Sequence, residues 1–298
     1  HRTVIGEPLH TTYRDVGVLG QPPVSQGHVL LQQLNIAETA PIADMGLLTA
    51  ETVHLLIEAK KLAFADRDAH LGDPDRADVP LSWLLSKEYA QARAAMIDMQ
   101  RATPQPHPGS RARSGTDTTY LAAADAQGNA VSWIQSVFHR FGSGVVAGKT
   151  GVVLNNRLAG FTLEPGHANT LEPGKKPAHT LNAYILTRNG QPWVIGGAPG
   201  GDYQTQTNLQ VITGLVDFGL NIAEAIDAPW WGSDDGNNVL LERRMPFEMV
   251  QGLRDRGHLV EMLGGWEGRR TVQLIERLSS GGLLASSDVR NEGHPAVW

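Results

Sequence analysis

Thr118 is the residue of this sequence best placed to act as a nucleophile. It follows the segment 101–114 (RATPQPHPGSRARS), whose three prolines, three arginines and lack of apolar runs are typical of a flexible linker. Residues 118–125 and 129–137 are apolar-rich and predict a β-hairpin. Cleavage before Thr118 would leave a hydroxyl nucleophile whose own α-amino group, with a pKa near neutrality, is its base. An ordinary linker before an ordinary hairpin fits the same pattern.

A glycine-rich segment, Gly196 to Gly201, separates an expected strand from an expected helix. Backbone N–H groups in such a loop can point into a cavity without side chains in the way, and the helix N-terminus adds positive potential. This is how an oxyanion hole is built, although a tight strand–helix turn has the same composition. The segment is not a phosphate loop, because no Gly-Lys-Ser/Thr follows it.

Hydrophobic spacing predicts the elements that must position these residues. Ser25 is expected to cap the first helix, and Asp66-Arg67-Asp68 reads as a solvated charge cluster. Hairpins separated by paired helices favour an α/β sandwich over a doubly wound sheet. The predicted helices are 28–38, 49–68, 86–99, 203–218, 221–227 and 246–256, and the predicted strands include 152–154, 182–187, 192–195, 239–242, 258–263 and 271–276.

Composition excludes several classes of function. The chain has 298 residues, 41% of them hydrophobic, so it can form one large domain or two smaller ones. A net charge of −6 with scattered basic residues argues against nucleic-acid binding. No apolar run approaches the roughly 20 residues of a membrane span. The absence of cysteine excludes thiol catalysis, and the 11 histidines lack metal-ligand spacing, so no metal and no cofactor are expected.

Ten segments, in the same order along the chain, resemble the γ-glutamyltransferase family of N-terminal-nucleophile hydrolases. The resemblance runs from about Gly20 to the C-terminus. The segments are 21–27 (QPPVSQG), 63–67 (AFADR), 71–74 (LGDP), 118–120 (TTY), 125–131 (DAQGNAV), 141–144 (FGSG), 154–156 (LNN), 173–177 (PGKKP), 197–201 (GAPGG) and 223–229 (AEAIDAP).

The resemblance implies an α+β fold, the four-layer αββα sandwich, and a self-cleaving precursor. Cleavage is expected between Asp117 and Thr118. Residues 1–117, mostly helical and with the linker 101–117, would be the C-terminal part of the large (α) subunit, and residues 118–298 would be the small (β) subunit. The implied partners are a small amide substrate and the N-terminal remainder of the precursor, in a heterodimer or a dimer of heterodimers. His1 is not a start methionine, so the chain is expected to be a fragment or processed piece.

The resemblance also assigns roles around the nucleophile. Ser136 matches the family's hydroxyl residue that orients the nucleophile. Gly200 and Gly201 match the family's oxyanion pair, and Thr119, Asn155 and Asn156 match polar positions that line its site. A turn after a strand would also explain the paired asparagines.

The sequence departs from the γ-glutamyl pattern at the expected substrate site. Gly160 stands where these enzymes have a carboxylate that grips the substrate's α-ammonium, and His179-Thr180 replaces a pair of serines. Arg157 instead offers a guanidinium suited to a carboxylate, as in the branch of the family that hydrolyses oxamate. These departures favour a small or acidic acyl group, although an ion-pair role for Arg157, at the surface or in the core, fits equally well.

Three functions therefore remain open. The first is a self-processing amidohydrolase acting on a small acidic amide. The second is a true γ-glutamyltransferase or glutathione hydrolase, which a γ-glutamyl anilide assay with and without an acceptor dipeptide would reveal. The third is an uncleaved relative that serves as a binding module, which an intact Asp117–Thr118 bond would favour.

Overall fold

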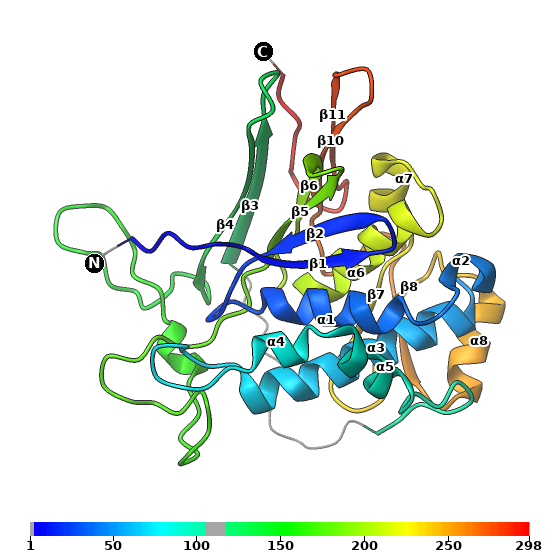
Figure 1. The fold of residues 1–298 in the computed structure, drawn as a ribbon, viewed down its shortest axis with the longest axis horizontal. Coiled ribbons are helices and arrows are strands. Elements are labelled where there is room, and N and C mark those ends of the chain that lie inside the picture. The colour runs from blue at the N-terminus through cyan, green and yellow to red at the C-terminus, as the bar shows by residue number, and fades with distance from the viewer. Residues whose placement is uncertain (1–2, 105–116, 298) are drawn as a thin grey trace.

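A six-stranded antiparallel sheet forms the centre of the fold in the computed structural model, which describes residues 3–104 and 117–297 (Figure 1). Its strand order is β1-β2-β5-β6-β10-β11, and every neighbouring pair is antiparallel. The strands are β1 (Leu9–Tyr13), β2 (Val16–Gly20), β5 (Ala183–Arg188), β6 (Gln191–Gly197), β10 (Gln273–Arg277) and β11 (Leu283–Ser287).

The two faces of this sheet are covered by different layers. Tyr184 and Leu186 of β5 belong to the main core shared with the helices, whereas Ala183 packs with Tyr120 and Ile134 of a separate hairpin. Successive side chains of a strand point to opposite faces, so this alternation places helices and hairpin on opposite sides of the sheet. Figure 1 shows the same arrangement, with the hairpin β3–β4 beside β5 and β6.

The helical layer is built around α1 (Gly27–Ala37), whose eleven residues are all buried. It packs against β1, β2, α3 and α6. The long helix α3 begins where the sequence predicts, because the Thr49 hydroxyl accepts a hydrogen bond from Thr52 N at 3.2 Å. The helices are α2 (Ile42–Met45), α3 (Ala50–His70), α4 (Leu81–Leu84), α5 (Lys87–Ala94), α6 (Tyr203–Val216), α7 (Ile222–Asp227) and α8 (Phe247–Asp255).

The hairpin on the opposite face consists of β3 (Asp117–Ala124) and β4 (Ala130–Phe138). It lies close to β6, because a Cβ added at Gly197 would overlap the Tyr120 ring. The Ser132 hydroxyl donates to the Gly196 carbonyl at 3.1 Å and fixes the same contact. A separate sheet of β7 (Trp231–Ser233), β8 (Asn238–Glu242) and β9 (Leu259–Leu263) lies beyond α6.

Several local predictions from the sequence need correction. Val153 makes only an isolated bridge to Val146, so the predicted strand 152–154 does not form. Gln26, not Ser25, occupies the N-cap position of α1, although the Ser25 hydroxyl accepts the Gly27 N–H at 3.2 Å. The helix predicted over 86–99 ends at Ala94. Residues 105–116 of the expected linker lie outside the described residues.

The charge cluster Asp66-Arg67-Asp68 is also not solvated, because Asp66 and Arg67 are buried. The Asp66 carboxylate accepts hydrogen bonds from the Tyr89 hydroxyl at 2.9 Å and from the Gln32 amide. Its partners come from neighbouring helices, which hydrophobic spacing along one helix does not reveal. Across the part of the chain that the structure describes, no helix is both long and apolar enough to cross a membrane.

Candidate active site

Thr118 and Ser136 face each other across the β3–β4 ladder. The Thr118 hydroxyl donates to the Ser136 hydroxyl oxygen at 3.1 Å. The Ser136 oxygen also accepts the backbone N–H of Phe138 at 2.9 Å, so its position is fixed from two sides. The ladder register shifts between Asp117 and Thr118, and such a bulge re-aims the side chains next to it.

The glycine loop lies between β6 and α6, as the sequence predicts. Its carbonyls point back to the helix, since the carbonyls of Gly200 and Gly201 accept Tyr203 N at 3.0 Å and Gln204 N at 3.2 Å. The N–H groups of Gly200 and Gly201 have no acceptor in residues 3–104 or 117–297. Two free, adjacent N–H groups can stabilise a developing oxyanion.

Glycine is required at position 200 for two independent reasons. Its φ is +129°, a backbone conformation that residues other than glycine rarely adopt. A Cβ at this position would also come within 2.9 Å of the Arg269 carbonyl oxygen. The backbone of the loop is therefore held in one conformation by local packing.

The β3–β4 hairpin packs against the end of β6 that leads into this loop. Thr118 and Tyr120 point to the same face of β3, because they are two residues apart. The Tyr120 ring lies against Gly197, which precedes Gly200 by three positions. The strand that carries the candidate nucleophile thus contacts β6, the strand that leads into the loop with the candidate oxyanion donors.

A small pocket, partly open to solvent, lies at the end of β4. Arg157 lies in its wall and is only 8% exposed. Among the residues that the structure describes, no carboxylate lies within ion-pair distance of its guanidinium, which instead lies over the Phe138 ring at 5.2 Å. The lining residues are Phe138, Arg157, Gly160, Ala178, His179 and Thr180.

Burial dominates the electrostatics of this pocket. Desolvation lowers the pKa of Arg157 to about 10, so the guanidinium still carries its charge at neutral pH. Desolvation, and then the nearby Arg157 charge, lower the pKa of His179 to about 4, so this imidazole is neutral. The pocket therefore offers one buried positive charge, and none of its lining residues is anionic.

Asn155 and Asn156 hold the pocket wall in place. The Asn155 side chain accepts Arg157 N at 3.0 Å, which starts the short 3₁₀ helix η1 (Arg157–Gly160). The Asn156 side chain contacts both His139 N, at 3.1 Å, and His139 Nδ1, at 2.8 Å. These amides attach the 3₁₀ turn to the end of β4.

Apart from the glycine loop, the structure gathers five of the predicted site residues into two connected groups. Thr118 and Ser136 form one group, and the pocket residues form the other: Arg157, His179 and Thr180. Phe138 joins them, because its N–H binds Ser136 and its ring contacts Arg157. Thr119 is exposed and, as the next residue along β3, points to the opposite face from Thr118. Asn155 is also exposed, and its side-chain oxygen is bound to Arg157 N within the local turn.

Sequence reasoning missed Phe138 and Gln26. Phe138 has a φ of +80°, which costs a non-glycine residue on the order of 1–3 kcal/mol, and such strain is often found at functional sites. Nothing in its local sequence indicates this conformation. Gln26 lies within the QPPVSQG segment, which carried the resemblance but no assigned role.

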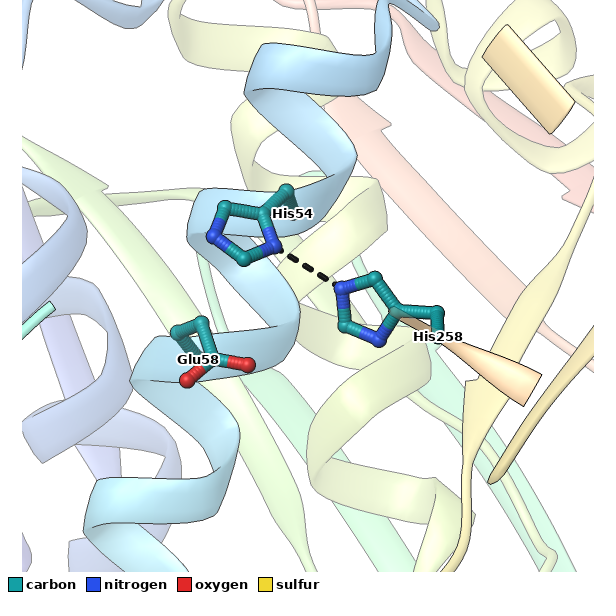
Figure 2. A group of neighbouring side chains, drawn as sticks. All are labelled: His54, Glu58 and His258. Atoms are coloured by element: carbon teal, nitrogen blue, oxygen red, sulfur yellow. Dashed lines mark hydrogen bonds between the residues drawn. The ribbon is translucent and has the colours of Figure 1, made fainter. Parts of the chain in front are cut away.

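A second polar cluster lies in the helical layer, outside this pocket. Figure 2 shows His54 and Glu58 on α3 pointing toward His258, with His54 Nδ1 2.8 Å from His258 Nε2. These three side chains are close enough together to hold a metal ion. However, the Lys61 ammonium donates to Glu58 Oε1 at 2.8 Å, so the carboxylate charge is already neutralised.

Comparison with known proteins identifies the family. The family described as gamma-glutamyltranspeptidase matches residues 1–298. The chain belongs to this family. It is 38% identical over 299 residues to the glutathione hydrolase-like YwrD proenzyme of Bacillus subtilis (strain 168), covering 98% of this chain and 56% of that protein. The oxamate amidohydrolase proenzyme of Klebsiella pneumoniae is 36% identical, and the match covers all of this chain and 56% of that protein. The chain thus spans about half the length of these curated relatives.

Solved structures confirm the expected fold. Cephalosporin acylase from Bacillus halodurans superposes with a TM-score of 0.87 at 38% identity, covering 98% of this chain and 53% of that chain. γ-Glutamyltranspeptidase from Pseudomonas nitroreducens complexed with L-DON gives a TM-score of 0.54 at 27% identity, covering 60% of this chain and 99% of that chain. The fold is the α+β fold of the N-terminal-nucleophile hydrolases.

Proposed function

We propose that this chain is the catalytic part of a self-processing amidohydrolase whose nucleophile is Thr118. The observation that carries the proposal is the hydrogen bond between Thr118 and Ser136, on a hairpin packed against the strand that leads into the Gly200–Gly201 loop, whose N–H groups have no acceptor among the described residues. In the precursor, the Thr118 hydroxyl oxygen attacks the carbonyl carbon of Asp117, and the Asp117–Thr118 amide becomes an ester. Water then hydrolyses this ester and leaves Thr118 with a free α-amino group.

The match with the Pseudomonas nitroreducens chain supports this cleavage position. Almost all of that separate chain corresponds to 60% of this chain. Residues 118–298 make up about the same share of the 298 residues. We accordingly assign residues 1–117 to the large subunit and 118–298 to the small subunit, with the N-terminal remainder of the precursor as the partner.

In the processed enzyme, the α-amine of Thr118 takes the proton of its own hydroxyl as the oxygen attacks the substrate amide. The N–H groups of Gly200 and Gly201 stabilise the tetrahedral oxyanion, an interaction typically worth about 10²–10³-fold in rate per donor. The leaving amine departs with the transferred proton, and an acyl ester remains on Thr118. Attack by water on this ester completes hydrolysis, and attack by an amine completes transfer.

The substrate class follows from the charge of the pocket. Arg157 is buried without a carboxylate partner in the described residues, and an unpaired buried guanidinium is costly unless a ligand supplies the anion. An acyl group that carries a carboxylate would supply this anion, and oxamate contains such an acyl group. A γ-glutamyl substrate is disfavoured, because Gly160 supplies no anion for its α-ammonium group.

A substrate panel on the full-length, processed protein tests the proposal. We expect hydrolysis of oxamate at a higher kcat/KM than hydrolysis of oxamide, its neutral counterpart. We expect little release of anilide from a γ-glutamyl anilide, with or without an acceptor dipeptide. Turnover of the γ-glutamyl anilide without turnover of oxamate would overturn the acidic-substrate assignment. An uncut, inactive protein would favour the binding-module alternative.

A further inference from the structure

We propose that Gln26 and Arg67 are positioning residues that hold the oxyanion loop and the substrate pocket in one fixed relationship. The proposal rests on the proposed function, because it concerns the same site. It assigns a role to two buried polar residues, one at the N-cap of α1 and one on α3, that neither bind the nucleophile nor line the substrate pocket.

Gln26 joins the two halves of the site through one side-chain amide. It is fully buried. Its Nε2 atom donates to the carbonyl of Thr180 at 2.7 Å and to the carbonyl of Gly201 at 3.2 Å. Thr180 lines the pocket and Gly201 is an oxyanion donor, so a single amide spans both. The backbone N–H of Gln26 also donates to the His179 carbonyl at 3.1 Å.

Arg67 fixes which way this amide points. Arg67 Nη1 donates to Gln26 Oε1 at 3.2 Å. A guanidinium has donors and no acceptor, so the amide oxygen must face Arg67 and the NH₂ group must face the two carbonyls. The orientation of Gln26 therefore follows from the chemistry of its neighbours.

Arg67 also reaches the loop directly. Its Nη1 donates to Asp202 Oδ1 at 2.7 Å, and Asp202 directly follows Gly201. Its Nε donates to Asp68, and its guanidinium lies 4.1 Å from the centre of the Phe64 ring, so the side chain is held in one orientation. The loop is therefore gripped at the Gly201 carbonyl through Gln26 and at the Asp202 side chain by Arg67.

These contacts matter because they hold the carbonyl sides of the loop. The Gly201 N–H shares a peptide plane with the Gly200 carbonyl, which Tyr203 N binds, and the Gln26 and Arg67 contacts fix the next peptide plane and the Asp202 side chain. The direction of the Gly201 N–H is therefore held from both sides. Loss of the Gln26 amide would release Gly201 and the Thr180 wall together. We expect this to affect the chemical step, since an oxyanion donor must be placed within a fraction of an ångström.

The test compares Gln26→Met and Arg67→Met with the matched control Gln33→Met. Gln33 is fully buried in α1, the helix that begins directly after Gln26. Its side-chain amide has no hydrogen-bond partner among the described residues. We expect Gln26→Met and Arg67→Met each to lower kcat about 10- to 100-fold. The double variant should lose less than the product of the two single losses, because the Arg67–Gln26 contact is shared, while the Arg67–Asp202 contact is lost only with Arg67. Gln33→Met should retain wild-type kcat.

A second readout separates this proposal from the proposed function. Hydrogen–deuterium exchange of the peptide containing Gly200 to Gln204 needs no turnover. We expect faster exchange there in Gln26→Met and Arg67→Met, and no change in Gln33→Met. If the wild-type protein neither cuts itself nor hydrolyses amides, the proposed function fails while the exchange result still decides the positioning role.

Wild-type kcat and wild-type loop exchange in both variants would overturn the positioning role. Equal effects in all three methionine variants would overturn it as well, because they would indicate a general loss of packing. If Arg67→Met does not fold, Arg67→Lys replaces it. This variant keeps the charge without the planar fork, and we expect an intermediate kcat and faster exchange of the same peptide.

Discussion

The hydroxyl oxygens of Thr118 and Ser136 lie 3.1 Å apart on facing positions of one antiparallel ladder. Because both residues are anchored by strand hydrogen bonds, the distance between them is set by the backbone. The second hydrogen bond to Ser136, from Phe138 N, leaves its oxygen little freedom to turn away. The pair is thus an arrangement that orients a threonine hydroxyl before any substrate is present.

Removal of the Ser136 hydroxyl tests this orientation. We expect Ser136→Ala to slow both self-cleavage and turnover by about 10- to 100-fold, as for one lost positioning hydrogen bond near a reacting atom. Ser136→Thr keeps the hydroxyl and should retain most of the activity. Rates come from intact-mass time courses and steady-state assays. Equal rates in Ser136→Ala and the wild type would contradict the assigned role.

Arg157 determines the substrate preference in this account. We expect Arg157→Met to raise KM for a small acidic amide about 10- to 100-fold, the effect of losing one charge-assisted contact. Hydrolysis of a neutral amide should change little. Arg188→Met is the matched control, because Arg188 is exposed at the C-terminal end of β5, where its guanidinium lies over the Trp193 ring. A parallel loss on acidic and neutral amides would argue against carboxylate recognition.

Gly200→Ala tests the oxyanion loop. The substitution places a Cβ against the Arg269 carbonyl at a φ of +129°, so the loop must shift. We expect kcat to fall at least about 100-fold. Gly190→Ala provides the control, because Gly190 also has a positive φ, +75°, but lies in an exposed turn with nothing near its Cβ position. The control should lose about 1 kcal/mol of stability and no activity.

Acidification should destabilise the fold through buried histidines. Burial, and then the nearby Arg67 charge, lower the pKa of His28 from 6.5 to about 4. Between these values the unfolded chain binds a proton that the folded chain does not, so stability is full above pH 6.5 and falls as the pH drops. We expect this histidine to account for a loss of about 2 kcal/mol at pH 5.

Urea denaturation at pH 7.5 and pH 5.0 measures this loss. The His28→Leu variant lacks the titrating group, so its stability should fall by about 2 kcal/mol less than that of the wild type over the same interval. An identical loss in both proteins would show that other groups dominate the acid response.

Local chemistry in the sequence predicted much of the fold. The predicted strands 182–187 and 192–195 are joined by the Asn189-Gly190 turn, with φ values of +51° and +75°, and the predicted helix 49–68 begins at the Thr49 cap, so both depend on neighbouring residues alone. The Gly200–Gly201 loop is also local, since a strand and a helix flank it directly. Such features were predicted close to where the structure has them.

Features that depend on distant partners were not predictable. The sequence predicted that Arg67 belongs to a solvated charge cluster. In the structure Arg67 is buried and bound to Asp202, which lies 135 positions later in the chain. The segment at Val153 is apolar enough for a strand but finds only one bridging partner. The pocket around Arg157 likewise requires Phe138 and His179, which only the folded chain brings together.

Intact-mass spectrometry of the full-length protein tests the central claim most directly, with Thr118→Ala as the comparison. We predict that the wild-type protein yields two masses whose boundary lies between Asp117 and Thr118, and that Thr118→Ala yields one uncut mass and no turnover. A wild-type protein that remains a single chain, or a Thr118→Ala variant that still cuts at this bond, would contradict the role of Thr118 as the nucleophile.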